Sequence, residues 1–262
     1  MQDPRIAVLA HNLVNYSTSL KPGEKVLIET IGFELPLTCA LIEAAYAAGA
    51  VPYVDIKHGS ALRTLLMQAQ PQQLEDIARW ECQRMSEMDA YIAIRARENI
   101  FDMADVPADK MSLYDHLWMH KVHHEIRVPK TKWVVLRYPN DSMAQMASMT
   151  TEAFEDFYFK VCNLDYAKMS RAMDPLVDLL NHSKEVHLVG PSLDLTFSIA
   201  GIPAIKCAGE CNIPDGEVYT APVKNSVNGV ITYNTPSINE GITFENIHFR
   251  LLNLDFFYTR FQ

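Results

Sequence analysis

Residues 25–56 read KVLIETIGFELPLTCALIEAAYAAGAVPYVDI, and this stretch decides the fold. Lys25 to Thr30 is an apolar run that predicts a strand. The alanine-rich run from Glu34 to Ala48 predicts a helix, which ends at Gly49 because glycine readily adopts the left-handed conformation that closes a helix. A second strand is predicted at Val51 to Ile56. Strand, helix and strand in this order form a βαβ unit, which indicates a parallel sheet.

The same alternation extends along the first part of the chain. Helices are predicted over 5–16, 67–85 and 112–125, and further strands over 90–96 and 131–138. We therefore expect residues 1–165 to form an α/β layered domain with a largely parallel sheet. Ligands of such sheets bind at the carboxyl ends of the strands, although no glycine-rich phosphate-binding pattern follows these strands. A small-ligand-binding α/β protein is thus only a third, weaker interpretation.

The pattern changes near Tyr166. Two helices are predicted over 150–161 and 167–180, followed by strands over 186–189, 194–198, 217–222 and 229–233. Asn228-Gly229 is typical of a two-residue hairpin turn. We expect residues 166–262 to be the start of a second, strand-rich catalytic domain that is incomplete.

Composition excludes several classes of protein. With 262 residues and 48% hydrophobic composition, the chain can bury one or two ordinary cores. The net charge of −9 argues against nucleic acid or an anionic membrane as a partner. No apolar run approaches the ~20 residues of a membrane span, and no signal-like segment opens the chain. The odd number of cysteines, five, suits a reducing compartment, so we expect a cytoplasmic protein.

One carboxylate follows a sharp turn in the run Asn212-Ile213-Pro214-Asp215-Gly216-Glu217-Val218. Pro214 restricts one backbone angle, Asp215 can bond to nearby backbone, and Gly216 tolerates a positive φ, so the three residues favour a turn. Glu217 then opens a strand, where a divalent cation would find a preplaced oxygen ligand. The alternative is an ordinary turn with Glu217 as its solvated flank.

This run belongs to a longer pattern that resembles a known family. The pattern covers residues 205–222, 226–229 and 233–237, and upstream residues 139–145, 154–159 and 194–201. It is similar to the thermophilic aminopeptidases, the aminopeptidase T, aminopeptidase S and PepS-like metallopeptidases, over nearly all of the chain up to about Phe249. The resemblance implies a metal-dependent aminopeptidase that removes N-terminal residues from peptides as a homodimer. It also implies two divalent ions per active site, zinc, cobalt or magnesium, with Glu217 as a ligand; no catalytic residue is assigned.

The chain departs from the family pattern after Glu217. The family's other ligands, a second Glu, two His and an Asp, have no matching position here. The remaining candidates lie outside any matching motif: Glu240, Glu245, His248 and Asp255. The apolar and aromatic tail over 251–262 also differs from the family, so we expect a truncation or frame shift near Phe249 and an inactive chain. The alternative function is a non-catalytic α/β fragment or a module that binds a peptide or a partner.

Three other groups of residues were considered as sites. His116, His120, His123 and His124 fall on one predicted helix, but the Glu of a zinc-protease helix is missing, so a metal site there is the weaker interpretation. Cys207 and Cys211 lack two further nearby ligands and are expected to be packed thiols. A further candidate is the run Arg95-Ala96-Arg97-Glu98 at a strand end. Its side chains are expected either to reach a cleft or to form a surface ion pair.

Overall fold

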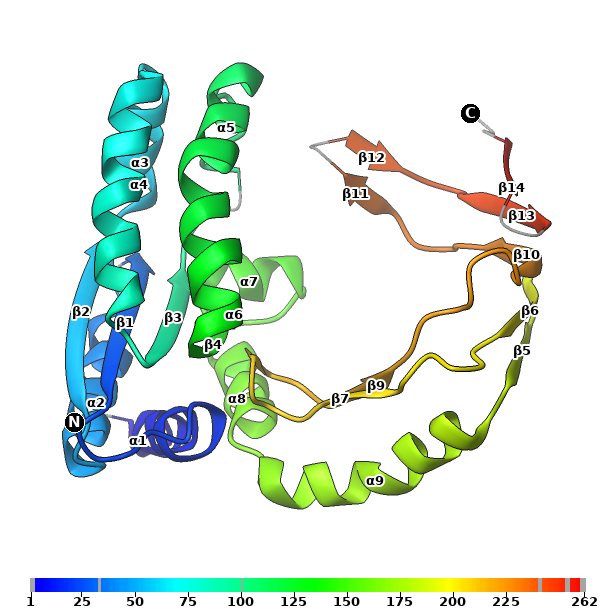
Figure 1. The fold of residues 1–262 in the computed structure, drawn as a ribbon, viewed down its shortest axis with the longest axis horizontal. Coiled ribbons are helices and arrows are strands. Elements are labelled where there is room, and N and C mark those ends of the chain that lie inside the picture. Colours follow the sequence, from blue (N-terminus) through cyan, green and yellow to red (C-terminus); the bar gives the residue numbers. More distant parts are fainter. Residues whose placement is uncertain (1–2, 33, 100, 240–241, 253–254, 260–262) are drawn as a thin grey trace. The chain divides into compact units, whose positions relative to one another are not determined.

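The structure is a computed structural model that describes residues 3–32, 34–99, 101–239, 242–252 and 255–259. Its internal contacts divide the chain into two compact units (Figure 1). Unit 1 comprises Met1–Ala167 and Ala208–Asp215, and unit 2 comprises Lys168–Cys207 and Gly216–Gln262. The predicted division into domains 1–165 and 166–262 stays a prediction.

Unit 1 is built on a parallel sheet. Its strand order is β2-β1-β3-β4-β8, and every neighbouring pair is parallel. The strands are β1 (Lys25–Gly32), β2 (Val51–Lys57), β3 (Ala90–Ala96), β4 (Lys132–Arg137) and β8 (Asn212–Ile213). The predicted α/β class with a largely parallel sheet is confirmed. The short strand β8 was not among the predicted strands.

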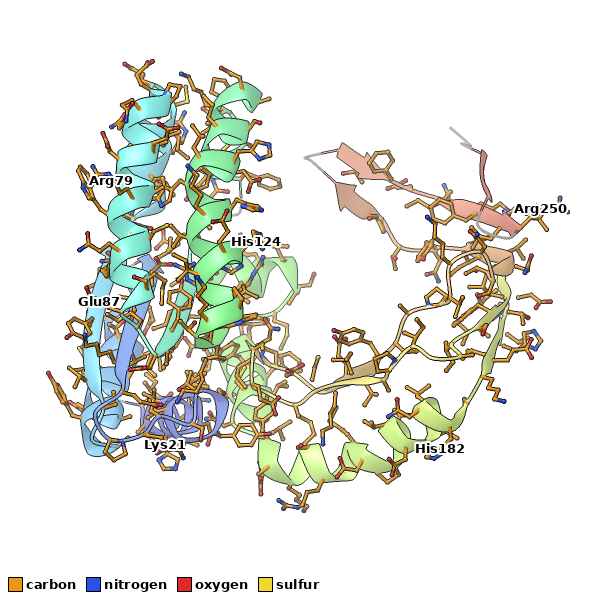
Figure 2. All side chains as sticks on the ribbon, viewed as in Figure 1. Lys21, Arg79, Glu87, His124, His182 and Arg250 are labelled. Atoms are coloured by element: carbon orange, nitrogen blue, oxygen red, sulfur yellow. The ribbon has the colours of Figure 1, made fainter. Side chains whose placement is uncertain are left out.

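Helices cover both faces of this sheet. The helices before and between the first strands are α1 (Pro4–Asn12), the π-helix η1 (Leu13–Ser17), α2 (Leu35–Ala47), α3 (Gly59–Leu66) and α4 (Pro71–Ser86). Those that follow are α5 (Ala108–Tyr114), the π-helix η2 (Asp115–Arg127), α6 (Val128–Lys130), α7 (Asp141–Met146), α8 (Thr151–Cys162) and α9 (Tyr166–His182), which continues into unit 2. His124 lies on η2 and His182 at the end of α9 (Figure 2).

In the described part of the chain, no helix has the length and apolar character needed to cross a membrane.

The helix predicted over 67–85 corresponds to α4, which begins later, at Pro71, and the preceding helix α3 was not predicted. Pro71 begins α4 at its first turn, and the residues before it close α3 at Leu66. Proline favours the first position of a helix because it has no N–H to leave unsatisfied there. The apolar periodicity therefore located the helix but not its first residue.

Successive side chains along each strand point to opposite faces of the unit 1 sheet, and the two faces differ in character. Thr30 of β1 hydrogen-bonds Thr38 of α2, with 2.8 Å between the hydroxyl oxygens, so α2 covers that face. Leu27 points to the other face, where it packs with Tyr91 of β3 and with Trp118 of η2 in one buried cluster. This second face is apolar near the amino ends of the strands and becomes charged toward their carboxyl ends.

Unit 2 contains an antiparallel sheet with strand order β14-β13-β10-β6-β5. Its strands are β5 (Glu185–Gly190), β6 (Leu193–Ser198), β10 (Asn228–Thr232), β13 (His248–Leu252) and β14 (Asp255–Thr259). Two ladders complete the described part: β7 (Ile205–Cys207) with β9 (Glu217–Tyr219), and β11 (Ser237–Asn239) with β12 (Ile242–Phe244). A small apolar cluster of Leu195, Val227 and Leu251 lies on the larger sheet.

The hairpin turn predicted at Asn228-Gly229 is wrong. Both residues lie in β10, where Asn228 pairs with Leu252 and Gly229 with Leu251. Gly229 has a φ of 129°, and a Cβ there would lie 1.9 Å from the carbonyl oxygen of Asp194. The glycine is therefore required by the close approach of β6 rather than by a turn.

Candidate functional site

The predicted ligand Glu217 opens the short strand β9. It pairs with Cys207 across the β7–β9 ladder, and its side chain is exposed. Within the described residues, no hydrogen bond or ion pair engages its carboxylate. The ladder therefore fixes the backbone of Glu217 and leaves both carboxylate oxygens available to a ligand.

The turn before Glu217 is held by unit 1. The Gly209 N–H donates to Oδ2 of Asp215 at 2.8 Å, and the Asp215 N–H donates to the Tyr166 hydroxyl at 3.3 Å. The Tyr16 hydroxyl donates to the Ala208 carbonyl at 2.9 Å. Gly209 has a φ of 97°, and a Cβ there would lie 2.7 Å from the Tyr166 ring. These contacts fix the loop that ends two residues before Glu217.

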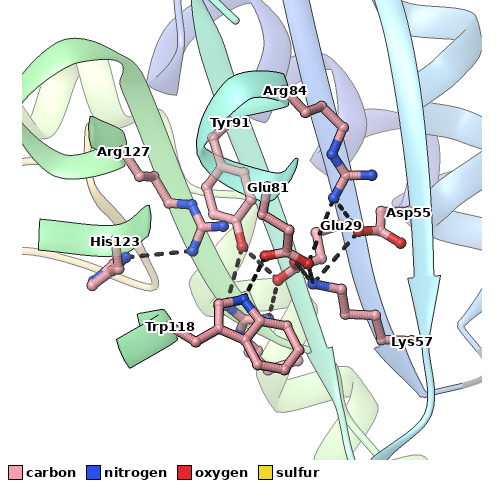
Figure 3. Close-up of polar contacts among 10 residues, drawn as sticks. Glu29, Asp55, Lys57, Glu81, Arg84, Tyr91, Trp118, His123 and Arg127 are labelled. Atoms are coloured by element: carbon pink, nitrogen blue, oxygen red, sulfur yellow. Dashed lines mark hydrogen bonds and ion pairs between the residues drawn. The ribbon is translucent and has the colours of Figure 1, made fainter. Parts of the chain in front are cut away.

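A second group of polar side chains gathers at the carboxyl ends of the parallel strands in unit 1 (Figure 3). Its centre is Glu29 of β1, a carboxylate that is only 4% exposed. Oε1 of Glu29 accepts from the Tyr91 hydroxyl at 2.6 Å and lies 2.7 Å from Nη1 of Arg95. Oε2 lies 2.9 Å from Nζ of Lys57. Three neighbouring strands thus place their charged residues around one buried carboxylate.

The network continues from Lys57 to the helices. Nζ of Lys57 lies 2.9 Å from Oε1 of Glu81 on α4, whose Oε2 accepts from the Trp118 indole at 2.9 Å. Nζ also lies 3.5 Å from Asp55, and Asp55 in turn pairs with Arg84 at 2.6 Å. Three carboxylates and three cations therefore neutralise one another on this side of the sheet.

Burial and neighbouring charges shift the pKa values of these groups in opposite directions. Burial by itself would raise the pKa of Glu29, but Lys57, Arg95 and Arg127 together with the Tyr91 hydrogen bond hold that pKa well below its usual range. Burial would lower the pKa of Lys57, yet the Glu29, Glu81 and Asp55 carboxylates raise it. Both residues are consequently charged at neutral pH.

A cavity of about 330 Å³ opens above this network. Its polar lining comes from Glu29, Lys57, Glu81, Arg95, Arg97, Arg127, Arg137 and Ser142. Its apolar lining comes mainly from η2, α3 and β1, with Trp118, Val122, Leu62 and Ile31. The cavity thus occupies the carboxyl edge of a parallel sheet, where open α/β sheets bind ligands. Arg95 and Arg97 both line it, so of the two interpretations of this strand end the structure favours contact with a cleft.

A family profile described as thermophilic metalloprotease (M29) matches residues 2–253. The chain belongs to this thermophilic metalloprotease family. The resemblance identified from the sequence is thereby confirmed, and so is the broad class of metalloprotease. No curated protein matches the chain significantly.

A solved structure shows the same fold as this M29 chain. Wild-type AmpT from Thermus thermophilus superposes with a TM-score of 0.77 at 19% sequence identity, covering 95% of this chain and 69% of that chain. A putative transcription repressor of the LacI family from Corynebacterium glutamicum gives a TM-score of 0.29 at 12% identity, covering 58% of this chain and 51% of its own. The second value is too low to carry an argument, and the first shows the fold alone.

M29 membership implies metal ions, and a two-metal centre requires several clustered ligands. In the ranges that the structure describes, no three His, Cys, Asp or Glu side chains lie together as a metal-binding group. His248, one of the candidates, has Nδ1 2.7 Å from the Thr232 hydroxyl. Glu240 and the side chain of Asp255 lie outside the described residues. The described residues therefore do not fit a two-metal centre.

The other sequence candidates do not form a metal site in the described part of this M29 chain either. The rings of His120 and His124 are 5.4 Å apart and those of His123 and His124 are 4.9 Å apart, while His120 lies 3.3 Å from Glu125. Cys207 and Cys211 are free thiols of intermediate burial. Neither group meets the requirement of three clustered ligands.

Sequence reasoning did not identify the network around Glu29. The sequence does contain a signal for this network. Glu29 interrupts an apolar strand, and three of the other predicted strands have a basic residue at or next to their carboxyl end: Lys57, Arg95 and Arg137. A charged residue inside such a strand requires a partner, because an unpaired buried charge is unfavourable. Which residues pair with it depends on the strand order and was not readable from the sequence.

Proposed function

We propose that this M29 protein is a metal-dependent aminopeptidase that hydrolyses N-terminal residues from peptides, and that Glu217 is one of its metal ligands. The observation that carries the proposal is the placement of Glu217: an exposed carboxylate without a described partner, on a paired strand, directly after an anchored turn. A carboxylate whose backbone is already fixed binds a divalent ion with little further ordering. Family membership as a metalloprotease supports the metal requirement.

The remaining ligands of the proposed centre come from residues outside the described part of the chain. A single carboxylate does not hold a divalent ion against water, so Glu217 alone is insufficient. We further propose two divalent ions per site, zinc, cobalt or magnesium, a homodimer and a cytoplasmic location. The resemblance to the thermophilic aminopeptidases and the composition of the chain support these points. The 262 residues taken alone are proposed to be inactive.

The test measures metal content and the release of amino acids from amino-acid amides, with added zinc or cobalt. It compares the unchanged chain with Glu217→Gln, which keeps the shape of the side chain and removes its charge. Glu185→Gln is the matched control, because Glu185 is also an exposed glutamate that opens a strand of unit 2.

Metal-dependent turnover that is lost in Glu217→Gln and kept in Glu185→Gln supports the assignment of Glu217. Bound metal without turnover in the unchanged chain supports the proposal that the 262 residues taken alone are inactive. Metal-dependent turnover that survives Glu217→Gln contradicts the assignment. Absence of both bound metal and turnover in the unchanged chain favours the alternative, a non-catalytic module that binds a peptide or a partner.

A further inference from the structure

The cavity of unit 1 carries more positive charge than its carboxylates neutralise. Glu29, Asp55 and Glu81 form ion pairs with Lys57, Arg84 and Arg95. The same cavity is lined in addition by Arg97, Arg127 and Arg137. In the described residues, no carboxylate forms an ion pair with these three side chains. This local excess contrasts with the net charge of −9 of the whole chain.

Arg127 is the most deeply placed of the three. The residue is only 4% exposed, and its guanidinium lies 3.8 Å from the centre of the Tyr91 ring. Its Nη1 is 3.5 Å from Nδ1 of His123, while its Nε is buried and has no hydrogen-bond partner among the described residues. A buried cation with an unsatisfied donor is unfavourable unless a further group engages it.

Arg97 and Arg137 lie at the ends of neighbouring strands. Arg97 directly follows β3, and Arg137 is the last residue of β4. Nε of Arg97 is buried without a hydrogen-bond partner in the described part of the chain. Arg97 also borders a smaller pocket that contains Asp102, with which it forms no ion pair. Two neighbouring strands therefore direct guanidinium groups to one cavity.

The chemistry of these walls specifies the kind of ligand. Guanidinium groups bind carboxylate and phosphate oxygens through paired N–H donors, and the bond is strengthened where water is excluded. Other lining residues are apolar, among them Trp118, Val122 and Leu62. A volume of about 330 Å³ is at the small end of the range for small-molecule sites.

We propose that this cavity binds a small organic anion, with its carboxylate or phosphate group on Arg97, Arg127 and Arg137 and its apolar body against Trp118 and Val122. Arg127 already interacts with the charge of Glu29, and the anion supplies the ion-pair partner that none of the three arginines has among the described residues. This site is formed by unit 1 alone, and its occupancy does not depend on the metal chemistry proposed for Glu217.

Calorimetric titration of the purified chain at low ionic strength tests the proposal. The probes are phenyl phosphate, phenylacetate, inorganic phosphate and the neutral 2-phenylacetamide. The variants are Arg97→Gln and Arg137→Gln, chosen because Arg127 is too buried for a variant that is certain to fold. Arg79→Gln is the control, since Arg79 is exposed on α4 and does not line the cavity (Figure 2).

At least one aromatic anion is expected to bind about tenfold or more tightly than the neutral amide and than inorganic phosphate. Each cavity variant should weaken that binding about tenfold, and Arg79→Gln should leave it unchanged. Tighter binding of phenyl phosphate identifies a phosphate ester, and tighter binding of phenylacetate identifies a carboxylate. The proposal is overturned if neither aromatic anion binds, if the amide or inorganic phosphate binds equally well, or if the cavity variants bind like the unchanged chain.

Discussion

Oε2 of Glu29 lies 2.9 Å from Nζ of Lys57, across the boundary between β1 and β2. The two residues point to the same face because Ile31, two positions after Glu29, is in register with Lys57. The Glu29 side chain is 5% exposed and that of Lys57 is 25% exposed. The pair is thus largely buried, and removal of one partner from such a pair strongly destabilises the folded protein.

Replacement of Glu29 by Gln should lower the free energy of unfolding by about 3 kcal/mol. The variant keeps the volume of the side chain but leaves Lys57 and Arg95 beside a neutral group in a buried position. Denaturant-induced unfolding at pH 7 measures the change. Glu87→Gln is the control, because Glu87 is exposed directly after α4, as its C-cap, and its pair with Lys25 spans 3.4 Å (Figure 2). Glu87→Gln should lower the free energy of unfolding by less than about 0.5 kcal/mol. Equal losses of stability in the two variants would contradict the prediction.

The contribution of Glu29 should depend on pH below its usual pKa of 4.5. In the folded protein the pKa of Glu29 is depressed, so the unfolded chain takes up a proton first as the pH falls. The stability that Glu29 provides is therefore complete above about pH 5 and declines below 4.5 toward the folded pKa. The difference in unfolding free energy between the unchanged chain and Glu29→Gln should shrink between pH 5 and pH 3. A difference that grows on acidification would contradict the depressed pKa.

Cys162 should resist alkylation in the folded protein. It is fully buried, and burial raises the pKa of its thiol to about 12. At pH 8 roughly one such thiol in ten thousand is ionised, and only the thiolate reacts. Cys39 is exposed and serves as the internal reference. Mass spectrometry after iodoacetamide treatment should find Cys39 modified well before Cys162, and the difference should disappear in denaturant. Equal rates under native conditions would refute the burial of Cys162.

Gly229→Ala should destabilise the antiparallel sheet of unit 2 by about 3 kcal/mol or more. The new Cβ would meet the Asp194 carbonyl oxygen at 1.9 Å, so β6 and β10 must separate. Gly201→Ala is the matched control in the same unit: its φ is also positive, at 78°, but no atom lies within 4 Å of a Cβ there. Gly201→Ala should lower the free energy of unfolding by about 1–2 kcal/mol. Thermal unfolding compares the two, and a larger loss at Gly201 would contradict the packing argument.

Particular residues show how far the sequence could predict the fold. The βαβ pattern of residues 25–56 was sufficient for the parallel sheet, since hydrophobic periodicity is a local property. The same local reasoning placed Asn228-Gly229 in a turn, although contact with Asp194 keeps that glycine in a strand. It also gave no sign of β8, because Asn212–Ile213 pairs with β4 far away in the chain.

The candidate site divides in the same way. The sequence located Glu217 after a Pro-Asp-Gly turn, and its role as a metal ligand stays a prediction. The cavity, by contrast, depends on residues that are distant in the chain: Glu29 is 62 positions from Tyr91 and 66 from Arg95. Only the strand order brings them together.

The sequence by itself determined the class of fold, the turn before Glu217 and membership of the M29 family, because each is written in short runs of residues. The tertiary structure decided which charges are paired and which are left over. Pairing of a buried charge is set by the register of neighbouring strands, since the free energy of each group depends on which opposite charges lie within a few ångströms. The excess of arginine in the cavity follows from that register.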